Sequence, residues 1–225
     1  MSELLNSIAK FIHEGKIKLV SIDVFDTIVF RKVAHPTDVF SMALQAYGNE
    51  NEWPMGCEEF KELRVNIETQ LRRQAVYGEV TLEDIYTELP FSSAVNKKLK
   101  LAELEVEKQV GFIYQPMQKF IELLRDDGIE VILISDMYLS RTQIRDCFFH
   151  NSTLLQSLPL HVSSEYKLNK SSGLLFEHLA NEQKIDKSGW LHLGDNIVSD
   201  FNMPKQKNFK QNICLLNWTL KLFGV

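Results

Sequence analysis

The sequence contains few cysteines, and their spacing excludes two common kinds of stabilising site. Only three are present, at positions 57, 147 and 214, and none of them forms a Cys-x-x-Cys pair. An odd number of widely spaced cysteines provides neither a disulfide framework nor the paired ligands of a structural zinc site. We therefore expect the protein to work in a reducing compartment, the cytoplasm.

The chain also lacks blocks of positive charge and long apolar runs. Its formal net charge is −5 and its lysines and arginines are scattered, so no basic field is present that would attract nucleic acid. No apolar run approaches the length of a membrane span. Residues 1–18 have the pattern of an amphipathic helix rather than of a secretory leader. We expect a soluble globular protein that binds neither nucleic acid nor membranes.

Apolar runs and amphipathic segments alternate along most of the chain. The apolar runs are typical of buried strands, which we expect at residues 18–22, 131–134, 158–162, 190–193 and 213–216. Helical patterns follow them, at residues 116–128, 140–149 and 173–181. This alternation predicts an α/β fold in which a parallel sheet is covered by helices on both faces. A chain of 225 residues is long enough for such a core and one further subdomain.

From residue 33 to residue 114 the alternation stops, and the periodic segments are all helical. Apolar residues recur at three- and four-residue spacing within 57–76 and within 95–110. Thr37 and Thr81 stand where helix N-caps belong. We expect an all-helical insert of residues 33–114 in an α/β core that is formed by residues 1–32 and 115–225.

Polar residues gather where three of the expected strands end. Asp23 and Asp26 follow the first strand, Ser135 and Asp136 follow the second, and the segment from Gly194 to Asp200 follows the run 190–193. The carboxyl ends of parallel strands share one edge of a sheet, and carboxylates are suitable ligands for a hard cation. We therefore expect Asp23 and Asp195 to meet around one divalent ion.

The order of these motifs resembles that of the haloacid dehalogenase-like (HAD) hydrolase superfamily. The order is an aspartate cluster at Asp23, a serine at Ser135, a lysine at Lys170 and the pair Asp195 and Asp200, and the resemblance covers essentially the whole chain. It implies a Rossmann-like core with a helical cap inserted after the first motif. It also implies an Mg²⁺-dependent phosphohydrolase, that is, a phosphatase, which acts on a small phosphorylated metabolite through an aspartyl-phosphate intermediate.

The resemblance gives the catalytic residues distinct roles. Asp23 is the expected nucleophile, while Ser135 and Lys170 bind the transferring phosphoryl group and neutralise its charge. Lys167 competes for the lysine role, although Lys170 has the better spacing to the helix that follows at residue 173.

The expected metal ligands are Asp23, Asp195 and the main-chain carbonyl of Phe25, with Asp200 behind them. Further contacts to the substrate are expected from four of the residues near the strand ends and from the arginine behind the first motif: Thr27, Ser135, Asp136, Lys170 and Arg31.

Phe25 departs from the usual phosphatase pattern, in which a second aspartate stands two residues after the nucleophile and protonates the leaving group. Asp26 is one residue later and can replace that acid only if the backbone turns sharply. Three alternatives therefore remain open: a substrate with a good leaving group, a metal-independent enzyme similar to the 2-haloacid dehalogenases, and a catalytically weak binding or regulatory module. His35 and His192 are expected to be structural.

Overall fold

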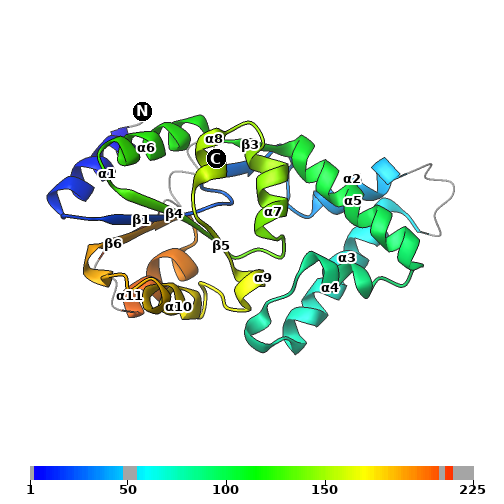
Figure 1. Cartoon of the computed structure of the whole chain (residues 1–225). Coiled ribbons are helices and arrows are strands. Elements are labelled where there is room, and N and C mark those ends of the chain that lie inside the picture. The colour runs from blue at the N-terminus through cyan, green and yellow to red at the C-terminus, as the bar shows by residue number, and fades with distance from the viewer. Residues whose placement is uncertain (1–2, 48–54, 208–210, 215–225) are drawn as a thin grey trace.

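The centre of the computed structural model, which describes residues 3–47, 55–207 and 211–214, is a parallel sheet (Figure 1). Five strands have the order β5-β4-β1-β6-β7 and run parallel to their neighbours. Their bounds are Leu19–Asp23 for β1, Glu130–Ser135 for β4, Leu160–Val162 for β5, Trp190–Gly194 for β6 and Gln211–Cys214 for β7. The α/β prediction is confirmed, and the central position of β1 places Asp23 between the ends of β4 and β6.

Helices cover both faces of this sheet, as Figure 1 shows. One face packs against α1 (Glu3–Glu14) and α6 (Gln115–Asp126), and the opposite face packs against α10 (Leu174–Glu182) with α11 (Met203–Gln206) beside it. Successive side chains of a strand point to opposite faces, so apolar residues of β1 and β4 are divided between the two resulting core clusters.

Two elements between β4 and α10 differ from their predicted bounds. The helix expected at 140–149 is a four-residue helix, α7 (Arg141–Ile144), that continues into a π-helical turn from Arg145 to Phe149. The strand expected at 158–162 begins at Leu160, after α8 (Thr153–Ser157), because Pro159 has no N–H group for the sheet. A short helix, α9 (Ser163–Tyr166), follows β5. The last expected strand is observed at Gln211–Cys214, and residues 215 and 216 lie outside the described part of the chain.

Four α-helices in the described residues between β2 and β3 form what we call the helical insert, residues 38–110. They are α2 (Asp38–Tyr47), α3 (Cys57–Gln74), α4 (Leu82–Thr87) and α5 (Ser93–Val110), and they lie together beyond the sheet (Figure 1). Thr81 begins α4 with a capping box, as predicted, since its hydroxyl accepts a hydrogen bond from the N–H of Asp84 at 3.1 Å. Among the described residues, no helix combines the length and apolar character that a bilayer span requires.

The segment predicted as an insert, 33–114, is not helical throughout. Gly111–Ile113 is a strand, β3, which pairs antiparallel with β2 (Val29–Arg31). Helix α5 ends at Val110 because the following glycine is extended and lies so close to the ring of Phe148 that a Cβ atom there would be 2.5 Å from the ring. The chain therefore enters and leaves the helical insert through two adjacent strands.

Candidate active site

The chain turns sharply directly after Asp23, the last residue of β1. Asp26 has a φ of 57°, in the left-handed region, and its N–H donates to the carbonyl of Val29 at 2.8 Å. The N–H groups of Ile28 and Val29 both donate to the carbonyl of Val24, at 2.9 and 2.8 Å. A left-handed residue other than glycine costs roughly 1 kcal/mol. The chain therefore bends sharply at Asp26, one residue after Phe25, where a bend was the condition for Asp26 to replace the acid; Asp26 is exposed and Asp23 is buried.

Three carboxylates from two neighbouring strand ends converge at this turn. Ligand oxygens of Asp23, Asp195 and Asp200 all lie within 4.8 Å of one another. Asp195 directly follows β6, and Asp200 belongs to a π-helical turn, Ile197–Asn202. Because β6 pairs with β1, residues far apart in the sequence reach one point at the edge of the sheet.

Lys170 brings a positive charge into this group of carboxylates. Its Nζ atom contacts Oδ1 of Asp23 and lies 2.6 Å from Oδ1 of Asp200. Its backbone N–H donates to both carboxylate oxygens of Asp136, at 2.9 and 3.0 Å. The other candidate, Lys167, instead forms an ion pair of 3.5 Å with Asp84 of the helical insert. Of the two lysines, the structure places Lys170 against the expected nucleophile.

Negative charge exceeds positive charge around Lys170. Burial would lower the pKa of Lys170, but Asp23 and Asp200 raise it above its ordinary value. Burial raises the pKa of Asp23 well above its usual range, although Lys170 opposes this effect. Burial also raises the pKa of Asp195 to about 6, with added repulsion from Asp26 and Asp200. A divalent cation would relieve this repulsion, so the residues fit an Mg²⁺ ion.

Asp200 already uses both of its carboxylate oxygens within the protein. Oδ1 accepts from Lys170, from Nε2 of His192 at 3.1 Å and from the hydroxyl of Ser199 at 3.2 Å. Oδ2 accepts from the N–H of Asn196 at 3.0 Å. Burial acts to raise the pKa of Asp200, yet Lys170 and His192 hold it well below its usual range. Asp23 and Asp195 therefore suit direct metal binding better than Asp200 does.

His192 connects Asp200 to a buried chain of hydrogen bonds that the sequence analysis did not find. Trp190 Nε1 lies 2.8 Å from the Ser21 hydroxyl, which lies 2.7 Å from Nδ1 of His192. The ionised Asp200 carboxylate can only accept, so Nε2 of His192 carries the proton; in the neutral ring Nδ1 then accepts from the Ser21 hydroxyl, which itself accepts from the indole N–H. Burial lowers the pKa of His192, in agreement with a neutral ring. The contact depends on the β1–β6 register, which pairs Ser21 with His192 and which no local sequence pattern reveals.

Two buried hydroxyl groups at the site have no hydrogen-bond partner among the described residues. They are Thr27 Oγ1 and Ser135 Oγ, on side chains that are 0% and 1% exposed. Ser135 ends β4, one residue beyond the Ile134 that pairs with Asp23. Leaving a buried hydroxyl unpaired costs about 1–3 kcal/mol. Both groups are therefore suited to donate to oxygen atoms of a bound ligand.

Arg31, which we expected to bind the substrate, forms an ion pair with a residue of the helical insert. Its guanidinium forms a two-point ion pair with Glu107 at the end of α5, at 2.7 and 2.8 Å. It also lies 4.5 Å from the centre of the Phe25 ring, which packs edge-on against Phe148. The arginine joins β2 to the helical insert and is near enough to Asp26 to oppose the rise in the pKa of that residue. The carboxylate of Asp136 accepts from the Lys170 backbone.

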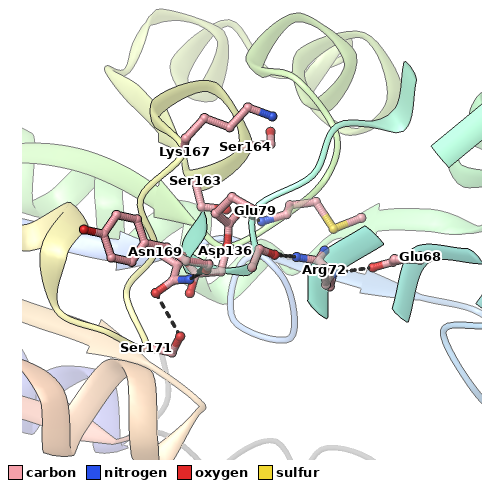
Figure 2. Close-up of polar contacts among 12 residues, drawn as sticks. Glu68, Arg72, Glu79, Asp136, Ser163, Ser164, Lys167, Asn169 and Ser171 are labelled. Carbon is pink, nitrogen blue, oxygen red and sulfur yellow. Dashed lines mark hydrogen bonds and ion pairs between the residues drawn. The ribbon is translucent and has the colours of Figure 1, made fainter. Parts of the chain in front are cut away.

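The helical insert touches the loop that carries Lys170 (Figure 2). Asn169 Nδ2 donates to the carbonyl of Tyr77 at 2.5 Å and to Oε1 of Glu79 at 3.2 Å. Figure 2 shows Glu79 between Asn169 on the core side and Arg72 on the side of the insert. Residues of the insert thus reach the neighbour of the lysine that contacts Asp23.

Comparison with known proteins identifies the fold. No protein-family model and no curated protein matches the chain. Among solved structures, a 2-haloacid dehalogenase from Pseudomonas syringae pv. Tomato DC3000 matches with a TM-score of 0.56 at 18% identity, over 92% of this chain and 99% of that one. A HAD phosphatase from Thermococcus onnurineus matches with a TM-score of 0.60 at 15% identity, over 92% and 98% of the two chains. A variant of a HAD family enzyme from Bacteroides thetaiotaomicron, in complex with magnesium and inorganic phosphate, matches with a TM-score of 0.59 at 14% identity, over 88% and 93%. The chain has the fold of the haloacid dehalogenase-like hydrolase superfamily, as the order of its motifs predicts.

Proposed function

We propose that the protein is an Mg²⁺-dependent phosphohydrolase that acts on a small phosphorylated metabolite. The observation that carries this proposal is the position of Asp23, which contacts Lys170 and lies beside Asp195 at the strand end where Thr27 and Ser135 present unpaired hydroxyl groups. A nucleophile and a positive charge in contact, with the Ser135 hydroxyl at the adjacent strand end and the Thr27 hydroxyl in the turn that follows Asp23, provide the groups that a phosphoryl site requires.

In the proposed reaction, a carboxylate oxygen of Asp23 attacks phosphorus. A bond forms from the aspartate oxygen to phosphorus while the bond from phosphorus to the leaving oxygen breaks, which gives an aspartyl phosphate. Water then attacks phosphorus, releases inorganic phosphate and restores the carboxylate. Lys170 and the hydroxyls of Thr27 and Ser135 stabilise the negative charge on the transferring oxygens in both steps.

Asp23, Asp195 and the main-chain carbonyl of Phe25 are the groups that would hold Mg²⁺. When bound there, the ion would reduce the repulsion between the attacking carboxylate and the phosphate. Asp200 would act from behind these ligands, since its hydrogen bonds to Lys170, His192 and Asn196 fix it in place. The solved structure from Bacteroides thetaiotaomicron with magnesium and inorganic phosphate supports this choice of ion and group.

Protonation of the leaving group is assigned to Asp26. Phe25 occupies the usual position of the acid, and its ring packs against Phe148 and Arg31. Desolvation raises the pKa of Asp26 against the opposing effect of Arg31, and its carboxylate is close enough to Asp195 to raise the pKa of that residue. Activated substrates such as acyl phosphates would depend least on this acid.

We assign the helical insert as the cap of the enzyme. For the cap domain as a whole we keep the limits expected from the sequence, residues 33–114, around a core of residues 1–32 and 115–225. Its contacts with Asn169 and with Arg31 support this assignment, since both lie next to the proposed active site. A closing cap would exclude water from the phosphoryl group.

A panel of phosphorylated metabolites tests the proposal, with phosphate release measured with and without Mg²⁺. We expect metal-stimulated release that Asp23→Asn abolishes. Release that persists undiminished in this variant would overturn the assignment of the nucleophile.

Phe25 and the likeness to a 2-haloacid dehalogenase favour one alternative, a metal-independent attack of Asp23 on carbon. Halide release from 2-haloacids in the presence of a chelator would identify that activity. Negligible turnover in both assays would favour a binding or regulatory role instead.

A further inference from the structure

The loop that carries Lys170 is attached on two sides. On the core side, the N–H of Lys170 donates to Asp136. On the other side, the preceding residue, Asn169, reaches the helical insert through its side chain. The position of this loop decides where the Lys170 ammonium lies relative to Asp23, so the attachment through Asn169 bears on the proposed reaction.

The amide of Asn169 uses its two ends for two different parts of the protein. Its Oδ1 accepts from the hydroxyl of Ser171 at 3.0 Å and from the N–H of Ser172 at 2.9 Å, both in its own loop. Its Nδ2 donates to the carbonyl of Tyr77 at 2.5 Å and to the carboxylate of Glu79 at 3.2 Å, both in the helical insert. The N–H of Ser172 can only donate, and the Tyr77 carbonyl and the Glu79 carboxylate can only accept, so the reversed orientation of the amide would lose these three bonds.

The segment of the insert that Asn169 contacts is held in an unusual conformation. Tyr77 and Gly78 have left-handed φ values of 60° and 73°. Arg72 supports the turn from within α3, since its Nη1 donates to the carbonyl of Gly78 at 2.9 Å and its Nε contacts Glu68 at 2.8 Å. A left-handed tyrosine costs about 1–2 kcal/mol, and such strain persists where the surrounding contacts enforce it. Here the strained turn directs the Tyr77 carbonyl at Asn169.

Glu79 makes this contact sensitive to charge. The side chains of Asn169 and Glu79 are 8% and 5% exposed. Burial raises the pKa of Glu79, and hydrogen bonds from Ser163 and Asn169 oppose the shift, while Asp136 adds to it. A negative charge in place of the Asn169 amide would face this carboxylate with little water between them.

We propose that Asn169 is a positioning residue that couples the position of the helical insert to Lys170. With the Tyr77–Glu79 segment seated on its amide, the loop holds the ammonium group against Asp23; when the insert moves away, the loop loses this support. The inference rests on the proposed function for its effect on catalysis, but the contact itself can be tested separately.

Asn169→Asp is the sharpest test, because it preserves the size and the acceptor end of the side chain and replaces only the donor end. The new oxygen would repel the Tyr77 carbonyl and Glu79. We expect kcat to fall by about tenfold or more, with a change in KM of less than about threefold, because Lys170 is displaced while the hydroxyl donors remain.

Glu79→Gln, combined with Asn169→Asp, tests whether the lost activity can be restored. Its amide can donate to the new carboxylate, so the double variant should recover part of the lost kcat, because only the repulsion from the Tyr77 carbonyl remains, whereas Glu79→Gln alone should stay close to wild type. Asn181→Asp, the same change at an exposed position of α10, is the matched control and should have no effect. A loss of kcat that the second substitution does not rescue would overturn the proposed coupling.

Amide hydrogen exchange gives a readout that needs no substrate. Asn169→Asp should increase exchange both in residues 76–82 of the insert and in residues 168–173 of the core loop, and Glu79→Gln should reverse both changes. Asn169→Ala, which removes the amide without adding charge, should show smaller increases in the same segments and serves if the aspartate variant does not fold. Unchanged exchange in the core loop would refute the inference even if the protein proved to be an active phosphatase. If Asn169→Asp increases exchange in both segments and Glu79→Gln reverses the increase, but the protein hydrolyses no substrate, the contact is supported and only the proposed function is rejected.

Discussion

The carboxylate of Asp200 packs against the Cα atom of Gly194 so closely that no side chain fits between them. A Cβ atom on Gly194 would lie 2.7 Å from the Cβ of Asp200 and still nearer to its carboxylate. Asp200 can move aside only by giving up contacts, because Lys170, His192 and Asn196 hold it from three directions. The glycine before Asp195 is therefore required by the packing of the second aspartate.

Gly194→Ala should damage the site while it leaves the fold intact. The methyl group would displace Asp200 and with it Lys170, and a shift on the order of 1 Å at such groups costs about a hundredfold in rate. Steady-state phosphatase assays and the half-saturating Mg²⁺ concentration would measure the effect. Gly56→Ala is the control, since nothing lies within 4 Å of a Cβ atom there; equal losses in the two variants would contradict the explanation.

Asp23→Asn should abolish activity and preserve or raise stability. The substitution removes the nucleophile, which should lower kcat by a factor on the order of a thousand or more. It also removes one of several buried negative charges that repel one another near Lys170. Thermal unfolding in the absence of metal would show an unchanged or higher Tm. A clear decrease in Tm would mean that the ion pair with Lys170 stabilises the fold more than the repulsion weakens it.

Lys170→Met should have the opposite effect on stability. The buried carboxylates of Asp23 and Asp200 would lose their shared positive partner, and removing one partner of a buried ion pair costs about 3–5 kcal/mol. Urea unfolding at neutral pH would measure this loss. Lys167→Met, at the exposed pair with Asp84, is the matched control and should change stability by less than about 1 kcal/mol.

The loss of activity in Asp26→Asn should increase with the pKa of the leaving group. If Asp26 protonates the leaving oxygen, alkyl phosphates should lose about a hundredfold or more, whereas acyl or nitrophenyl phosphates should lose little. A series of substrates with leaving groups of increasing pKa would show a steeper dependence of kcat/KM in the variant. Parallel lines for variant and wild type would exclude Asp26 as the acid.

Ser21→Ala tests the buried chain that ends at Asp200. Trp190 Nε1 would lose its acceptor and His192 Nδ1 its donor, which should cost about 1–3 kcal/mol of unfolding free energy. The tautomer of His192, followed by nitrogen chemical shifts, should be the Nε2–H form in both proteins, because the Asp200 carboxylate still accepts the Nε2 proton in the variant. A wild-type ring protonated at Nδ1 would contradict the direction assigned to the chain.

Sequence reasoning located the residues that follow directly from the sheet. Asp23, Ser135 and Asp195 each stand at or just beyond the end of an apolar run, and parallel strands carry such residues to one edge. The helices of the insert were visible in their three- and four-residue periodicity. These features depend on local pattern and on one rule of sheet topology.

Local sequence patterns did not predict the contacts between distant elements. Arg31 was expected at the substrate, but the pairing of β2 with β3 places it beside Glu107. His192 was expected to be structural, but its partners were not predicted. Only the register of β1 against β6 shows that it contacts Ser21 and, through its other nitrogen, Asp200. Long-range pairing of this kind depends on three-dimensional packing rather than on spacing along the chain.

The two adjacent strands β2 and β3, beside which Arg31 of β2 forms an ion pair with Glu107 of α5, have a consequence for how such an enzyme changes over evolution. The helical insert enters and leaves the core through this one pair of strands, so its parts away from Asn169 can be lengthened, shortened or exchanged without disturbing the carboxylates at the sheet edge. Selectivity for the organic part of a substrate and the chemistry at phosphorus can thus change separately, except where the insert meets the core through the Asn169 amide, the Lys167–Asp84 ion pair and the hydrogen bond from the Leu82 N–H to the Tyr138 carbonyl.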